Sequence, residues 1–329
     1  MNLVSAKLRS QFFRVMVFSL IGLLGLMLVT TTSAQTGSSD SGGVVVETLA
    51  EIPASTGGIA VDAQGNVYVG DIGPPTNRAL GTKVYKITPE GEASIFAEGD
   101  LFMAASGNAF DSQGNLLQSN YIGHTINKIS PNGVVSVFVR NLSGPVGIVV
   151  DADDNLYVAN CNAGNVQKYG PDGTRLDTYV SARFNCPNGI ALGDDGNVYV
   201  ANFNGGSIIK IDIETRQITQ FVNVGTSNNG HIFNGGDGKF YLADRGQNLI
   251  YTLSFDGELN VLAGSGEVGR ADGPALESTF FRPNDISMSP DGKILYFNHV
   301  VPTAQGSDNF PSIIRKIILN PDDATEGGE

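Results

Sequence analysis

The sequence predicts an all-β fold and, within that class, a six-bladed β-propeller. One unit recurs six times at intervals of roughly 40–55 residues, which is the spacing of propeller blades. The composition agrees, because 42 glycines and a charged fraction of 16% suit short strands joined by many tight turns. The units cover residues 57–71, 107–120, 146–160, 188–202, 229–244 and 284–299, and their opening residues are Gly58, Gly107, Gly147, Gly189, Gly230 and Asp285.

Each unit contains four strand signals. The first two are short apolar stretches on either side of an Asp/Gly turn, such as 59–61 and 67–69. The third alternates apolar and polar residues, and the fourth follows a turn rich in Pro and Gly. Third strands are expected at 83–88, 125–130, 165–170, 207–212, 249–254 and 313–318, and fourth strands at 93–98, 134–139, 175–180, 217–222 and 259–264.

The sixth unit lacks a fourth strand, because the chain ends there in Pro321 and a polar acidic tail. An orphan strand at 44–49 precedes the first unit. We expect it to pair with residues 313–318 and close the ring, which removes an exposed sheet edge. The alternative is a frayed N-terminal strand. On this interpretation the propeller covers residues 44–320.

The two ends of the chain have distinct compositions. Residues 1–34 are predicted to be a secretory signal peptide, with a basic start, an apolar run at 15–29 and small residues before Gln35. An uncleaved anchor is the alternative, although the run is short for a spanning helix. Residues 35–43 are expected to be a flexible linker and 321–329 an acidic tail. We therefore expect a secreted or periplasmic monomer, at a membrane only if the first segment is uncleaved.

The charge and the missing motifs narrow the possible partners. The formal net charge is -13, so the protein repels phosphate backbones. We therefore expect no nucleic acid partner. The sequence also has no Gly-rich phosphate loop, no His-Glu-x-x-His helix and no Cys-x-x-Cys pair.

One face of the ring is expected to carry the function. Loops that follow second strands and loops that enter the next blade must share a face, called the top face here. The long segments 72–82, 97–106, 264–283 and 300–311 belong to it. Long loops on a rigid scaffold commonly carry binding or catalytic residues.

The two cysteines, Cys161 and Cys186, map to the same face. One follows the second strand of blade 3 and the other enters blade 4, so their loops should be neighbours. In an exported protein this placement predicts a disulfide, with two free thiols as the alternative.

The residues just before the opening positions should point into the central channel at its top. In blades 4, 5 and 6 these residues are Asn188, Asn229 and Asn284. Amide oxygens suit a hard cation, so we expect Ca²⁺ or another divalent cation to bind there. The alternative is that these asparagines only stabilise turns.

The histidines form a second candidate group. His231 takes a position that is Ile in four other units, and His299 takes the place of an Asp or Asn that caps a turn. A buried His needs a hydrogen-bond partner and can act as a general base near neutral pH. His231 and His299 are therefore the candidate catalytic residues, and satisfied core histidines are the alternative. Asn108 replaces an Ile across the ring, and His124 lies in a top-face loop.

The last unit shows a family resemblance. Residues 262–286 read LAGSGEVGRADGPALESTFFRPNDI, and 289–297 read SPDGKILYF. This stretch resembles an NHL repeat, and the Asn-Gly and Pro-Asn-Asp openings resemble the gluconolactonase/senescence-marker-protein superfamily of six-bladed propellers. The resemblance implies a channel metal, held by Asn, Asp and Glu, that assists lactone or ester hydrolysis. The family's Glu in blade 1 and Asp in blade 5 correspond here to Gly57 and Asn229.

Three functions remain open from the sequence. The leading hypothesis is a metal-assisted hydrolase of a small-molecule lactone or ester. A non-catalytic NHL-type binding module for a protein or glycan on the top face competes with it, because the two carboxylates are missing. A lyase of related propeller fold is the third.

Overall fold

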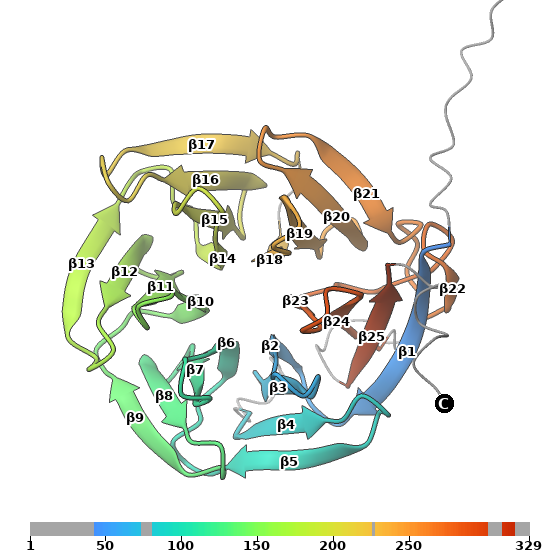
Figure 1. Cartoon of the computed structure of the whole chain (residues 1–329), viewed down its shortest axis with the longest axis horizontal. Helices are drawn as coiled ribbons and strands as arrows, with labels where there is room; N and C mark the ends of the chain where they lie inside the picture. The colour runs from blue at the N-terminus through green and yellow to red at the C-terminus, as the bar shows by residue number, and fades with distance from the viewer. Residues whose placement is uncertain (1–42, 74–80, 226–227, 302–310, 320–329) are drawn as a thin grey trace, which may run out of the picture. The chain divides into compact units, whose positions relative to one another are not determined.

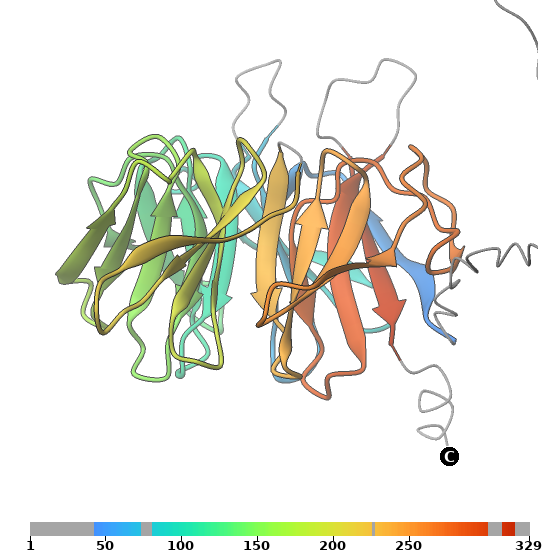
Figure 2. The same ribbon diagram turned by 90° about the horizontal axis from the view of Figure 1, so that it is seen from above.

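The computed structural model describes residues 43–73, 81–225, 228–301 and 311–319. The described residues form six antiparallel sheets around a central axis, which confirms the six-bladed propeller (Figures 1 and 2). The predicted signal peptide, almost all of the linker and the acidic tail lie outside the described residues. In the described part of the chain, no helix is long and apolar enough to cross a membrane.

Blades 1 to 5 each contain four strands that pair in chain order. Blade 1 contains β2 (Thr56–Val61), β3 (Val67–Asp71), β4 (Lys83–Ile87) and β5 (Ala93–Glu98); blade 2 contains β6 (Ala105–Phe110), β7 (Leu116–Asn120), β8 (Thr125–Ile129) and β9 (Val135–Val139). Blade 3 contains β10 (Pro145–Val150), β11 (Leu156–Asn160), β12 (Asn165–Tyr169) and β13 (Arg175–Val180). Blade 4 contains β14 (Pro187–Leu192), β15 (Val198–Asn202), β16 (Ser207–Ile211) and β17 (Ile218–Asn223); blade 5 contains β18 (Asn229–Asn234), β19 (Lys239–Asp244), β20 (Leu249–Ser254) and β21 (Leu259–Ala263).

Blade 6 joins the two ends of the propeller. It contains β23 (Ile286–Met288), β24 (Ile294–Val300), β25 (Ser312–Ile318) and the N-terminal β1 (Val45–Ile52). The register places Val45 opposite Ile318, so the predicted closure is confirmed. A two-residue strand, β22 (Gly273–Pro274), adds to the outer edge of β1. The segment 264–283, expected as an irregular top-face loop, thus reaches the outer edge of this blade (Figure 1).

Glycines at the blade openings let neighbouring inner strands approach closely. A Cβ atom added to Gly147 or to Gly230 would lie 2.2 Å from a backbone oxygen of the next blade. No side chain fits into that space, so the repeat needs glycine there. Blade 6 has Asp285 at this position, and its carboxylate reaches across to the backbone of Ile59 in blade 1. The sixth junction therefore carries a buried acid where the other five have none.

The repeated Asp/Gly turns have a common local cause. Asp62 Oδ1 accepts hydrogen bonds from the backbone N–H of Asn66 at 2.8 Å and from its side-chain amide at 3.0 Å. The same pattern recurs at Asp111 and Asp151. Such Asx turns join the first two strands without using the ladder groups.

Apolar clusters between neighbouring blades hold the ring together. One joins Tyr241 and Ile250 of blade 5 to Phe297 and Ile317 of blade 6, and it also buries Phe280 of the segment 264–283. Burial of this kind contributes about 25 cal/mol per Å² of apolar surface. The inner strands are thereby fixed around the channel, which gives the top face a rigid base.

Candidate functional site

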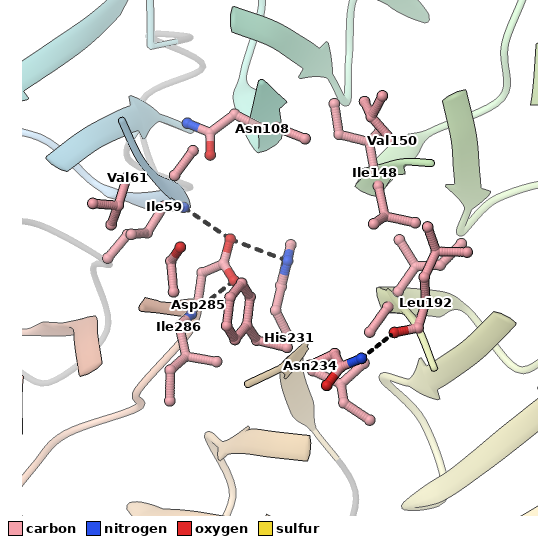
Figure 3. A pocket seen from close by; sticks show the side chains of 18 of the residues that line it. Ile59, Val61, Asn108, Ile148, Val150, Leu192, His231, Asn234, Asp285 and Ile286 are labelled. Carbon is pink, nitrogen blue, oxygen red and sulfur yellow. Dashed lines mark hydrogen bonds and ion pairs between the residues drawn. The ribbon is translucent and has the colours of Figure 1, made fainter. Parts of the chain in front are cut away.

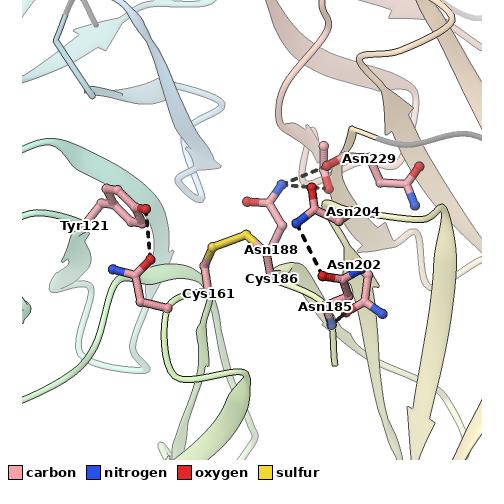
Figure 4. Close-up of a disulfide and its surroundings, with 10 residues drawn as sticks. Tyr121, Cys161, Asn185, Cys186, Asn188, Asn202, Asn204 and Asn229 are labelled. Carbon is pink, nitrogen blue, oxygen red and sulfur yellow. Dashed lines mark hydrogen bonds between the residues drawn. A yellow bond between two sulfur atoms is a disulfide. The ribbon is translucent and has the colours of Figure 1, made fainter. Parts of the chain in front are cut away.

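The predicted disulfide joins Cys161, just after β11, to Cys186, just before β14 (Figure 4). The loops of blades 3 and 4 are therefore neighbours on the top face, as expected. The bond also indicates an oxidising compartment, because such disulfides are rare where thiols are kept reduced.

A cavity of about 220 Å³, called the top pocket here, lies at the top end of the channel. Residues from two rings of equivalent positions line it, four from the first ring and five from the second. The first ring contains the residue just before the opening position of each blade. The second ring contains the residue that follows the Asp, Asn or His at the end of the second strand of each blade. The first ring supplies Ser106, Val146, Asn188 and Asn284, and the second supplies Ile72, Tyr121, Cys161, Phe203 and Arg245.

The structure brings two of the three candidate asparagines into the top pocket. Asn188 donates through Nδ2 to the carbonyl oxygen of Asn229 at 2.9 Å. Asn284 donates through Nδ2 to the carbonyl oxygen of Gly57 at 2.9 Å, and its Oδ1 accepts from Arg245 Nη1 at 2.6 Å. Asn229 is fully buried and does not line the pocket, and its side-chain amide has no hydrogen-bond partner among the described residues.

These residues do not fit a divalent cation. Calcium takes six to eight oxygen ligands, carboxylates among them. Here the oxygen of Asn284 already accepts from a guanidinium, whose positive charge would repel a metal ion. In the described parts of the chain, no cluster of three or more His, Cys, Asp or Glu side chains could hold a metal. The described residues of the top pocket therefore offer no ligand set for a divalent cation.

His231 is paired with the acid of the sixth junction. Its Nδ1 lies 3.2 Å from Asp285 Oδ2 (Figure 3). The carboxylate also accepts from the backbone N–H of Ile59 at 2.8 Å and of Ile286 at 2.7 Å. Two backbone donors thus hold Asp285, and the contact with its carboxylate assigns the proton of a neutral His231 to Nδ1. Within the described residues, no hydrogen bond engages Nε2 of His231.

The surroundings keep this pair in the protonation state that a base requires. Burial lowers the pKa of His231, while the Asp285 charge raises it and the Arg245 charge lowers it. Burial raises the pKa of Asp285, and the histidine and two backbone donors act against that rise. His231 is therefore neutral at pH 7, with Nε2 as its acceptor.

The His231–Asp285 pair lies between two cavities. Below the top pocket, a channel cavity of about 330 Å³ runs between the inner strands of all six blades. His231 lines both cavities, and Asp285 lines the channel cavity. Most of the remaining wall is aliphatic, as at Ile148 and Val150, while Asn108 lines the cavity from blade 2 (Figure 3).

His299 has different surroundings. Its Nε2 accepts from Arg315 Nη1 at 3.0 Å, and its Nδ1 lies 3.0 Å from the carbonyl oxygen of Val300. Burial, and after it the Arg315 charge, lowers the pKa of His299 to about 3. The imidazole of His299 is stacked with the aromatic ring of Phe297, and His299 lines neither cavity. These are the surroundings of a core residue, with both nitrogens engaged.

Sequence reasoning missed Arg245, and it did not predict that Asp285 pairs with His231. Both carried a signal in the alignment of the repeats. Asp285 is the one opening residue that is not glycine. Arg245 follows the capping Asp of blade 5, where the other blades have Ile, Tyr, Cys, Phe and Val.

Comparison with known protein families agrees with this architecture. Residues 46–195 match the SMP-30/Gluconolactonase/LRE-like region, and residues 184–211 match the NHL repeat. The fold is a six-bladed propeller, and over these residues the sequence is similar to the SMP-30/Gluconolactonase/LRE-like region and to the NHL repeat. No curated protein matches the sequence.

Solved structures of three different functional classes share the fold. A gluconolactonase from Xanthomonas campestris is 16% identical with a TM-score of 0.65, covering 85% of this chain and 90% of its own. Virginiamycin B lyase from Staphylococcus aureus is 16% identical with a TM-score of 0.58, covering 84% and 100%. An auxiliary nutrient binding protein from Bacteroides ovatus is 15% identical with a TM-score of 0.62, covering 83% and 76%. At such identities the likeness concerns the fold alone.

Proposed function

We propose that this protein is an exported hydrolase that opens a small lactone or related ester in the top pocket. The observation that carries the proposal is the buried His231–Asp285 pair at the base of that pocket. A histidine oriented by a carboxylate, with its second nitrogen available, is the arrangement of a general base. The SMP-30/Gluconolactonase/LRE-like match over residues 46–195 supports the reaction class.

The proposed reaction uses water and the two side chains. Nε2 of His231 takes a proton from water while the water oxygen attacks the substrate carbonyl. The ring C–O bond then breaks, and the leaving oxygen takes the proton back from His231 to give a hydroxy acid. Asp285 holds the required tautomer and stabilises the imidazolium that forms.

The disulfide between Cys161 and Cys186 and the predicted signal peptide support export to the periplasm or the exterior. A cavity of about 220 Å³ is below the usual range for drug-sized ligands, so it favours a small substrate.

The test is hydrolysis of γ-butyrolactone, δ-valerolactone, D-glucono-δ-lactone and phenyl acetate by the exported chain and by His231→Ala. We expect His231→Ala to lower kcat/KM by about 10²–10⁴-fold, the range for a lost general base. His124→Ala is the matched control, because His124 lines neither cavity, and it should retain activity. No turnover of any substrate, or full activity in His231→Ala, would exclude the proposal.

A binding module is the second candidate, because the donor set lacks the carboxylates expected of a metal-assisted enzyme. It predicts saturable ligand binding without product. Mass analysis of products also separates hydrolysis from a lyase reaction, since hydrolysis adds one water to the substrate and elimination adds none.

A further inference from the structure

The top pocket holds a single formal charge among the described residues that line it. That charge is Arg245 of the second ring, whose other lining members are Ile72, Tyr121, Cys161 and Phe203. No carboxylate is among the described lining residues, although the whole chain is strongly acidic, with a net charge of -13. The described lining residues thus carry a formal charge opposite in sign to the net charge of the protein.

The guanidinium is held at a defined position. Arg245 Nη1 donates to Asn284 Oδ1 at 2.6 Å, and Asn284 is itself fixed through Nδ2 to the carbonyl oxygen of Gly57 at 2.9 Å. Burial and the nearby Arg282 charge lower the pKa of Arg245 to about 10. Arg245 therefore stays protonated at neutral pH, beside the pocket that His231 also lines.

We propose that Arg245 is the fixed cation of the top pocket and takes the place of a metal ion, so that the site binds anionic oxygen without a metal. The proposal rests on the proposed function, in that it takes the top pocket as the substrate site. The donor set favours it, because the oxygen of Asn284, expected as a metal ligand, instead accepts from Arg245.

The chemistry assigns two tasks to this guanidinium. When water attacks the carbonyl, negative charge develops on the carbonyl oxygen, and a preorganised donor stabilises it. After the ring opens, the product carries a carboxylate, which an arginine binds through charge-assisted hydrogen bonds. The substrate class is therefore an uncharged lactone or ester whose product is a small carboxylate.

The experiment compares Arg245→Gln and Arg245→Lys with the wild type. Arg175→Gln is the matched control, because Arg175 is an exposed arginine at the start of β13 in blade 3. Calorimetry measures binding of 4-hydroxybutyrate, 5-hydroxypentanoate and D-gluconate, with 1,4-butanediol as the uncharged probe. We expect binding of at least one carboxylate, not of the diol, to weaken by at least about tenfold in Arg245→Gln and less in Arg245→Lys. Melting curves of each variant verify the fold.

Activity and metal dependence complete the test. Arg245→Gln should lower kcat/KM by about 10²–10³-fold, the range for a lost oxyanion donor. Chelator should leave wild-type activity unchanged. Loss of activity with chelator and its return with Ca²⁺ would overturn the proposal, as would unchanged carboxylate binding in Arg245→Gln.

The two proposals can fail separately. Hydrolysis that needs His231 but not Arg245 would support the proposed function and would contradict the proposal that Arg245 is the fixed cation of the site. Carboxylate binding that needs Arg245, without any hydrolysis, would support the anion site at Arg245 and would contradict the proposed hydrolase function.

Discussion

His231 and His299 are both buried, with exposed fractions of 5% and 0%, yet their neighbours carry opposite charges. His231 lies beside the carboxylate of Asp285, and His299 lies beside the guanidinium of Arg315. Both residues stand out in the repeats as histidines at positions where other blades have different residues. The comparison shows that the charge of the neighbour and access to a cavity decide what a buried histidine can do.

The physical difference lies in which nitrogen remains available. The carboxylate of Asp285 contacts Nδ1 of His231, which leaves Nε2 able to accept a proton. The same carboxylate would stabilise the imidazolium that then forms. Arg315 donates to Nε2 of His299, so that nitrogen is occupied and added positive charge is opposed. One arrangement suits a base and the other suits a rigid core.

The largest expected effect comes from neutralising the acid of the first pair. We expect Asp285→Asn to lower the kcat/KM of lactone hydrolysis by about 10²–10⁴-fold, because the tautomer of His231 is no longer fixed and the imidazolium loses its counter-charge. The measurement is steady-state kinetics on the best substrate of the panel, with a melting curve to verify the fold.

The matched control neutralises the acid of the second region. Asp272 pairs with Arg315 at 2.6 Å and is half-exposed. Asp272→Asn should keep kcat/KM within about twofold, because no catalytic group depends on it. Equal losses of kcat/KM in Asp285→Asn and Asp272→Asn would contradict the claim that only His231 acts as a base.

The second effect concerns stability. Arg315 is fully buried and donates to His299 and to the carbonyl oxygen of Ala271. We expect Arg315→Met to lower the free energy of unfolding by about 2–3 kcal/mol, because buried acceptors lose their donor. Urea unfolding measures the change, and an unchanged midpoint would show that Arg315 does not anchor this region.

Much of the fold followed from the repeats. Strand period, turn residues and blade spacing are local signals, and closure by 44–49 followed from counting strands in the last unit. The small strand β22 could not be predicted, because Gly273–Pro274 has no strand pattern and pairs only where β1 offers an edge. A tertiary surface, not local preference, decides that pairing.

The site was predicted less completely. The structure brings His231 and two of the three predicted asparagines to the top pocket, and their roles stay predictions. The partners Asp285 and Arg245 depend on which side chains meet across blade junctions, and a single sequence does not give that geometry. Repeats predict where residues lie around the ring better than what they touch.

The smallest effect tests the second histidine by pH. The pKa of His299 is about 3 in the folded chain and about 6.5 when unfolded. A depressed folded pKa gives stability that is complete above about pH 6.5 and is lost as pH falls toward the folded value. We therefore expect the wild type to lose about 1.6 kcal/mol more than His299→Gln between pH 6.5 and pH 5.

The measurement is urea unfolding of both proteins across this range, with the difference taken at each pH. Carboxylates that titrate in the same window affect both proteins equally, so the difference isolates His299. A parallel loss in the two proteins would mean that His299 can accept a proton in the folded state. The contrast with His231 would then rest on access to the cavities and not on charge.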